Sequence, residues 1–72
     1  MTTVAVIGVG SMGRNHVRVY REMPEVELVG IADENPHAAE NVSRTYCVPG
    51  YTDYREMLMR ERPDAVSVVV PS

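Results

Sequence analysis

Three glycines near the start of the chain have the spacing of a nucleotide-binding turn. Gly8, Gly10 and Gly13 follow an apolar run at Val4–Ile7 and precede a helical pattern, and Asp33 ends the next apolar run. In this fingerprint the first glycine permits a tight turn, the second leaves room for a diphosphate, and the third lets the helix pack closely on the strand. The acid accepts hydrogen bonds from ribose hydroxyls. The pattern predicts a dinucleotide site and disfavours the alternative of a glycine-rich structural turn.

The helix that begins near Ser11 directs unpaired backbone N–H groups and the positive end of its dipole at the phosphates. Ser11 and Met12 are predicted to bind through these amides; the Ser11 hydroxyl is a further donor, and Met12 is equally a filler of space under the cofactor. A cation in the first turn of a helix, such as Arg14, opposes the helix dipole and is explained if an anion binds nearby. An arginine that simply faces solvent is an equal alternative. We interpret His16 as a hydrogen-bonded structural residue rather than a catalytic base.

Charge near Asp33 predicts which cofactor binds. Its carboxylate suits the free ribose hydroxyls of NAD and repels the 2′-phosphate of NADP, and Glu34 adds negative charge with no arginine close behind. NAD is therefore the predicted cofactor and NADP is less favoured, while an ordinary acid at a strand end is the alternative for Asp33. Pro71 and Ser72 complete the predicted binding set, because they end the last strand where open α/β sheets bind ligands.

Strands and helices are predicted to alternate along the whole chain. Strands are expected at Val4–Ile7, at Val26–Ala32, near Gly50–Tyr51 and at Ala65–Val70. Helices are expected from Ser11 to about Met23, from Pro36 with Asn35 as its cap, and from an Asp53–Glu56 capping box to before Pro63. Right-handed crossovers then give a parallel sheet of order 3-2-1-4. This arrangement is a partial Rossmann-like, doubly wound α/β fold with a three-layer αβα architecture.

Composition excludes several classes of function. The 72 residues are 44% hydrophobic and 24% charged with a net charge of −3, and the seven arginines are interleaved with acids, so no basic stripe is present for nucleic acid. No apolar run has the length of a membrane span. A single cysteine, Cys47, fits a reducing cytoplasm and is expected to be packed rather than catalytic. The two histidines and this cysteine lack the spacing of a zinc site.

The last predicted strand is an open, apolar edge, and such edges recruit partners. We expect residues 1–72 to be the N-terminal part of a dinucleotide-binding domain, with the rest of that domain and a substrate domain beyond Ser72. Assembly through the edge is the less favoured alternative. The expected partners are a small-molecule substrate and further copies of the chain, without nucleic acid or membrane.

The sequence resembles the N-terminal part of the Gfo/Idh/MocA oxidoreductases, a family named for glucose–fructose oxidoreductase and inositol dehydrogenase. The resemblance covers essentially the whole chain. It is carried by Gly8-x-Gly10-x-x-Gly13-x-x-His16, Asp33, Tyr51-x-Asp53-Tyr54, and Pro63-Asp64-Ala65-Val66 before a strand that ends at Pro71.

The resemblance implies an NAD- or NADP-binding domain followed by a substrate domain with a large open sheet. It further implies hydride transfer between the nicotinamide and a hydroxyl-bearing carbon, often of a sugar or cyclitol. The family's lysine in a Glu-Lys-Pro motif and its downstream Asp and His lie beyond this chain, so no catalytic residue is assigned within it. A non-catalytic NAD(H)-sensing module and a site for S-adenosylmethionine stay open as alternatives.

Overall fold

The computed structural model describes residues 1–69, without the side chains of Ser11 and Met12. Strands and helices alternate in this order: β1 (Thr2–Ile7), α1 (Ser11–Glu22), β2 (Val26–Ala32), α2 (Pro36–Tyr46), β3 (Gly50–Tyr51), α3 (Tyr54–Glu61) and β4 (Ala65–Val68). The alternation and the type of every element agree with the sequence prediction.

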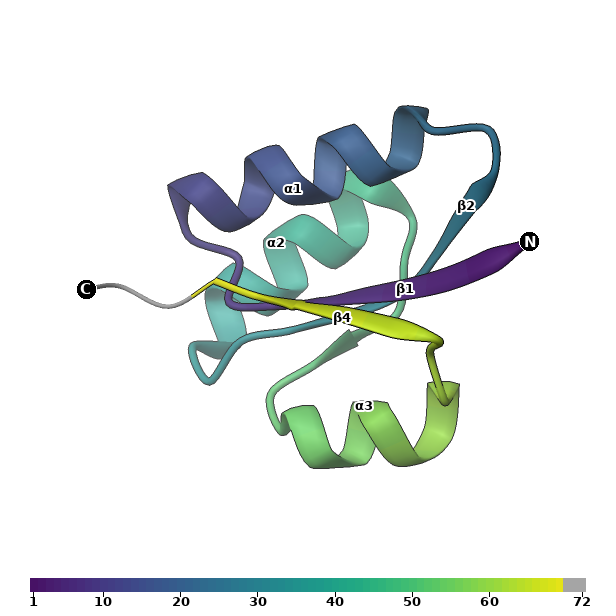
Figure 1. The fold of residues 1–72 in the computed structure, drawn as a ribbon. Coiled ribbons are helices and arrows are strands. Elements are labelled where there is room, and N and C mark those ends of the chain that lie inside the picture. The colour runs from purple at the N-terminus through teal and green to yellow at the C-terminus, as the bar shows by residue number, and fades with distance from the viewer. Residues whose placement is uncertain (70–72) are drawn as a thin grey trace.

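The strands form one parallel sheet of order β3-β2-β1-β4. Helices α1 and α2 cover one face of this sheet, and α3 covers the other (Figure 1). The carboxyl ends of β1, β2 and β4 meet at one edge of the sheet because all strands run in the same direction. The predicted Rossmann-like, three-layer α/β fold is thereby confirmed.

Apolar side chains form a separate core on each face of the sheet. Consecutive β1 residues divide between the two cores, because side chains of a strand alternate in direction: Ala5 packs with Met57 of α3, and Val6 packs on the α1–α2 face. The larger cluster, on the α1–α2 face, consists of Val6, Val9, Val17, Ile31, Ala39, Val42 and Val48. The two central strands, β1 and β2, therefore contribute to a core on both faces, as parallel strands usually do.

Two element boundaries differ from the prediction. β1 begins at Thr2 rather than Val4, since Thr3 is tied to Asp64: the Thr3 N–H donates to Asp64 Oδ2 at 3.0 Å, and the Asp64 N–H donates to the Thr3 carbonyl at 2.9 Å. β4 ends at Val68, although the Val69 N–H still donates to the Ile7 carbonyl at 2.8 Å. Val70, the predicted last residue of this strand, lies outside the described residues.

Polar caps begin the second and third helices. Asn35 Oδ1 accepts from the His37 and Ala38 N–H groups at the start of α2, as predicted. Asp53 likewise accepts from the Arg55 N–H at the start of α3, which lowers the pKa of the Asp53 carboxyl. The reciprocal half of the predicted capping box is not found among the described residues.

Cys47 is exposed, so the prediction of a packed cysteine was wrong. It is the C-cap of α2 and has φ 54°, a left-handed conformation in which the chain leaves the helix. The backbone reverses here, and the following residue, Val48, enters the core instead.

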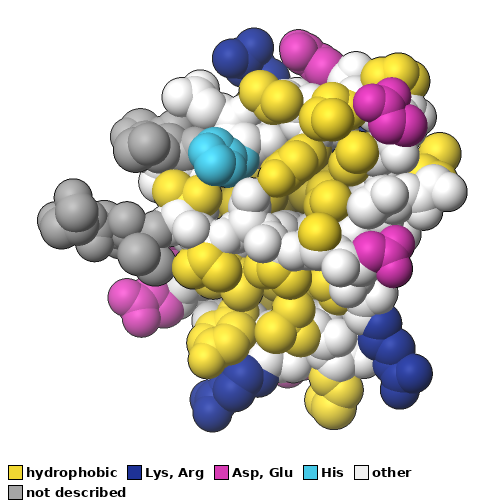
Figure 2. Space-filling view, in the orientation of Figure 1, with side chains coloured by type: hydrophobic (Ala, Val, Ile, Leu, Met, Phe, Trp, Pro, Cys, Tyr) yellow, Lys and Arg dark blue, Asp and Glu magenta, His cyan; other side chains and the backbone are white. Residues whose placement is uncertain are grey.

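The face on which β4 lies in front carries hydrophobic side chains at its centre and charged groups at its margin (Figure 2). Val66 and Val68 of β4 are 39% and 63% exposed. Among residues 1–69, none of the helices has the length and hydropathy needed to cross a bilayer.

Candidate functional site

Gly8 makes the turn that follows β1, and its conformation requires glycine. Its φ is +90°, and a Cβ added there would lie 1.9 Å from the Val69 carbonyl oxygen. Its N–H donates to the Ala32 carbonyl at 2.7 Å, which joins the turn to the end of β2. The first glycine thus permits both the turn and the close approach of the chain beyond β4.

Gly13 and Gly10 have opposite surroundings. A Cβ on Gly13 would lie 1.9 Å from the Gly8 carbonyl oxygen, so the first turn of α1 packs directly on the end of β1. A Cβ on Gly10 would meet nothing within 4 Å. The backbone at Gly10 therefore faces open space, where a ligand can approach it closely.

The N-terminus of α1 differs from those of the other two helices because none of the side chains that the structure describes caps it. Its N-cap is Gly10, which makes no side-chain hydrogen bond to the first turn, whereas Asn35 and Asp53 cap α2 and α3. The α1 amides are therefore open to an external acceptor, and the helix dipole favours an anion there.

Asp33 lies at the end of β2, beside this turn. Its half-buried carboxylate accepts from the Val9 N–H through Oδ2 at 2.9 Å and from the Asn35 N–H through Oδ1 at 2.8 Å. The acid is thus brought to the glycine turn, as the fingerprint requires, although these hydrogen bonds to backbone amides were not predicted.

The start of α2 offers little to a phosphate. Asn35 already occupies the His37 and Ala38 amides, and Pro36 has no N–H. The exposed Glu34 adds negative charge next to Asp33. The surface formed by Asp33, Glu34 and the start of α2 therefore repels an additional phosphate group.

A cleft of about 290 Å³ runs along the carboxyl ends of the strands, next to Asp33. Its size is close to the lower limit of about 300 Å³ for small-molecule sites. It is lined by Ile7, Gly8, Ala32, Asp33, Glu34, Thr52, Tyr54 and Val69. The cleft therefore lies where open α/β sheets bind ligands.

The sequence prediction named Gly8, Asp33 and Glu34 among these lining residues and missed others. Thr52 and Tyr54 also line the cleft, whereas the Tyr51 hydroxyl donates to Glu61 at 2.5 Å, and this hydrogen bond raises the pKa of Tyr51. Ile7, Ala32 and Val69 were missed. Their position at or just after the end of a parallel strand is the signal that could have identified them.

Other predicted residues are placed less completely. The side chains of Ser11 and Met12 are not described, and Pro71 and Ser72 lie outside the described residues. His16 is half-buried on α1, but the hydrogen bonds found among the described residues include none to its ring, so its predicted hydrogen bond is not observed. No group of three or more His, Cys, Asp or Glu side chains within residues 1–69 could hold a metal ion.

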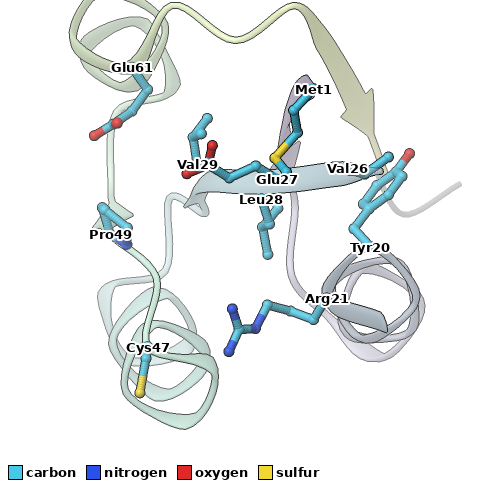
Figure 3. Close-up of a pocket in the computed structure, with 10 residues that line it drawn as sticks. All are labelled: Met1, Tyr20, Arg21, Val26, Glu27, Leu28, Val29, Cys47, Pro49 and Glu61. Atoms are coloured by element: carbon cyan, nitrogen blue, oxygen red, sulfur yellow. The ribbon is translucent and has the colours of Figure 1, made fainter. Parts of the chain in front are cut away.

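A larger cavity, of about 730 Å³, adjoins the first half of β2 (Figure 3). Arg21 and Glu27 line it together with apolar residues, and the Cys47 sulfur points away from the other lining residues. Its walls come from the last residues of α1 and α3 and from the segment after α2, and they include none of the predicted cofactor residues. Size alone does not make it the functional site.

Comparisons with known proteins agree with this geometry. Residues 2–72 match the GFO_IDH_MocA oxidoreductase family, NAD-binding Rossmann fold. None of the curated proteins compared with the chain matches it in sequence.

Several solved structures are similar to this chain over nearly its whole length. A Gfo/Idh/MocA family oxidoreductase from Vibrio cholerae is 29% identical with a TM-score of 0.83, and the match covers 99% of this chain and 23% of that chain. The WlbA dehydrogenase from Bordetella pertussis, in complex with NADH and UDP-GlcNAcA, is 25% identical with a TM-score of 0.89, covering 99% and 22%.

A scyllo-inositol dehydrogenase from Lactobacillus casei, with bound NAD(H) and scyllo-inositol, is 20% identical with a TM-score of 0.87, covering 100% of this chain and 22% of that chain. At this identity the likeness concerns the fold alone. This chain spans less than a quarter of the length of each of these three proteins.

Proposed function

This chain belongs to the Gfo/Idh/MocA oxidoreductase family and has its NAD-binding Rossmann fold, and from that premise we propose that it is the cofactor-binding part of a hydride-transferring enzyme. The observation that carries the proposal is the uncapped start of α1, where Gly10 leaves open space above the backbone. A diphosphate placed there receives hydrogen bonds from the amides of the first turn, including those of Ser11 and Met12.

The remaining predicted residues take the following roles in this proposal. Asp33, at the border of the cleft, accepts from the adenosine ribose hydroxyls, and Glu34 lies beside it. Pro71 and Ser72 are proposed to border the nicotinamide side. When bound, the nicotinamide supplies the hydride chemistry, while the residues of this chain hold and orient the cofactor.

We propose NAD rather than NADP as the working cofactor. A 2′-phosphate would meet the Asp33 and Glu34 carboxylates, and the capping Asn35 leaves it no free amide at the start of α2. The Asp33 carboxylate instead offers a hydrogen-bond acceptor to a free 2′-hydroxyl. Both effects favour NAD, which lacks the 2′-phosphate.

The proposed substrate is a sugar or cyclitol whose hydroxyl-bearing carbon exchanges hydride with the cofactor. The WlbA and scyllo-inositol dehydrogenase structures hold UDP-GlcNAcA and scyllo-inositol, and both ligands carry several such carbons. We further propose a cytoplasmic protein without nucleic-acid or membrane partners. A homo-oligomer is the proposed assembled state.

A fluorescence titration with NADH tests the cofactor assignment directly. We expect saturable binding of NADH, weaker binding of NADPH and no competition by S-adenosylmethionine. Failure of NADH to bind, or tighter binding of S-adenosylmethionine, would overturn the assignment.

Hydride transfer separates an enzyme from an NAD(H)-sensing module. The intact protein, given NAD and a panel of cyclitols and sugars, is expected to produce NADH absorbance with at least one of them. Tight NADH binding without turnover on any member of the panel would favour the sensor.

A further inference from the structure

Both oxygens of the Asp33 carboxylate accept a backbone N–H, one from each side. Oδ2 accepts from Val9 at 2.9 Å and Oδ1 accepts from Asn35 at 2.8 Å. Hydrogen bonds to an ionised acceptor are about twice as strong as those between neutral groups. The side chain is therefore held in one orientation between the glycine turn and the start of α2.

Val9 is the residue of the turn that this carboxylate holds. It lies between Gly8 and Gly10, and its own side chain is fully buried beside Val6 and Val17. The neighbouring Gly8 N–H is bound to β2 as well, through the Ala32 carbonyl. The consecutive Gly8 and Val9 amides thus donate to the consecutive residues Ala32 and Asp33 at the end of β2.

We propose that Asp33 is a positioning residue for the diphosphate turn, in addition to its contact with the ribose. A carboxylate has about four acceptor positions, so the two used by backbone amides leave others for ribose hydroxyls. The inference rests on the proposed cofactor function. It assigns to one side chain both the shape of the phosphate-binding turn and the recognition of the adenosine ribose.

Loss of the carboxylate has a specific consequence in this turn. The Val9 N–H would lose its partner, and the glycines on either side of Val9 would gain conformational freedom, because glycine restricts the backbone least. The amides beyond Gly10 would then be less well placed for a diphosphate. Binding should weaken even for a ligand that makes no ribose contact with Asp33.

A ligand lacking the ribose hydroxyls separates the two roles. NADH and its analogue without the 2′- and 3′-hydroxyls of the adenosine ribose are titrated against wild-type protein, Asp33→Ala and Asp33→Asn. If Asp33 only contacts the ribose, wild type and variants bind the analogue equally. We expect Asp33→Ala to bind the analogue about tenfold more weakly, and Asp33→Asn to lie between.

Amide hydrogen exchange measured by NMR without any nucleotide reports on the turn itself. In Asp33→Ala we expect the Val9 amide to exchange about tenfold faster than in wild type. Asp64→Ala is the matched control, because Asp64 accepts from the Thr3 N–H at 3.0 Å near the other end of β1. It should accelerate exchange at Thr3 while leaving Val9 exchange and NADH affinity unchanged.

Equal affinity of wild type and Asp33→Ala for the analogue, together with unchanged Val9 exchange, would overturn the positioning role. Asp33→Asn provides the same readouts if the alanine variant does not fold. Failure of the wild-type protein to bind NADH would instead overturn the proposed function, and Val9 exchange would still decide whether Asp33 holds the turn.

Discussion

At the scale of single residues, two glycines three positions apart tolerate a methyl group very differently. Gly10 has φ −64°, which alanine readily adopts, and open space at its Cβ position. Gly13 has the carbonyl oxygen of Gly8 1.9 Å from its Cβ position. Gly13 therefore serves the packing of helix on strand, whereas the structure leaves Gly10 free for the role proposed for it, close approach of the diphosphate.

Gly10→Ala and Gly13→Ala should separate these effects. We expect Gly10→Ala to change the free energy of unfolding by about 0.5 kcal/mol or less and to weaken NADH binding at least about tenfold, because its methyl group would occupy the diphosphate space. Gly13→Ala should lose about 2 kcal/mol or more of stability. Urea unfolding and NADH titration measure the two quantities, and undiminished NADH affinity in Gly10→Ala would contradict the placement of the diphosphate.

Charge at the end of β2 should decide between the two nicotinamide cofactors. Asp33→Ala removes an acceptor for the ribose and also a charge that repels a 2′-phosphate, so we expect a loss of NADH affinity of about tenfold or more and a smaller loss for NADPH. Parallel titrations of wild type and variant measure the ratio. An equal loss for both cofactors would remove the ribose contact from the account.

At the scale of elements, the start of α2 depends on one side chain. Asn35 accepts from two amides of the first turn, so Asn35→Ala should cost about 1 kcal/mol in the free energy of unfolding. Asn41→Ala makes the same chemical change at an exposed position inside the helix, where alanine is the better helix former, and it should be neutral or slightly stabilising. Thermal unfolding of the two variants compares them, and equal destabilisation would argue against the cap.

Local signals explain why so much of the element order was predictable. Pro36 after Asn35 and Pro63 after α3 mark helix ends through the backbone itself, and the three-glycine spacing marks the turn. The exposure of Cys47 and the hydrogen bond between Asp33 and Val9 had no such signal. Both features depend on the path of the backbone between elements in the folded structure, and the local sequence does not determine that path.

At the scale of the whole molecule, the two ends of the described chain are joined by one carboxylate. Asp64, just before β4, accepts from both the N–H and the hydroxyl of Thr3 in β1, at 3.0 and 3.1 Å. These residues are 61 positions apart, so the contact closes almost the entire chain. This contact can form only when β4 lies beside β1, its neighbour in the sheet.

The hydrogen bonds from Thr3 lower the pKa of the Asp64 carboxyl below its ordinary value of 3.8. A pKa that is lower in the folded state means that ionised Asp64 favours folding. The contribution is therefore fully present above pH 3.8 and is lost as the pH falls through the lower folded value. Part of the acid sensitivity of the fold should come from this one group.

Asp64→Asn keeps the size of the side chain but removes its titration. We expect the variant to be less stable than wild type near neutral pH. The difference should shrink as the pH falls below 3.8, because Asp64 of the unfolded chain takes up a proton there, whereas Asp64 of the folded chain does so only at lower pH. Urea unfolding at about pH 6 and about pH 3 measures both differences. Thr3→Val, which removes the hydroxyl but keeps the N–H, should reproduce part of the neutral-pH loss. A stability difference that stays constant across this range would show that the carboxylate joins the two strands without its charge contributing to the fold.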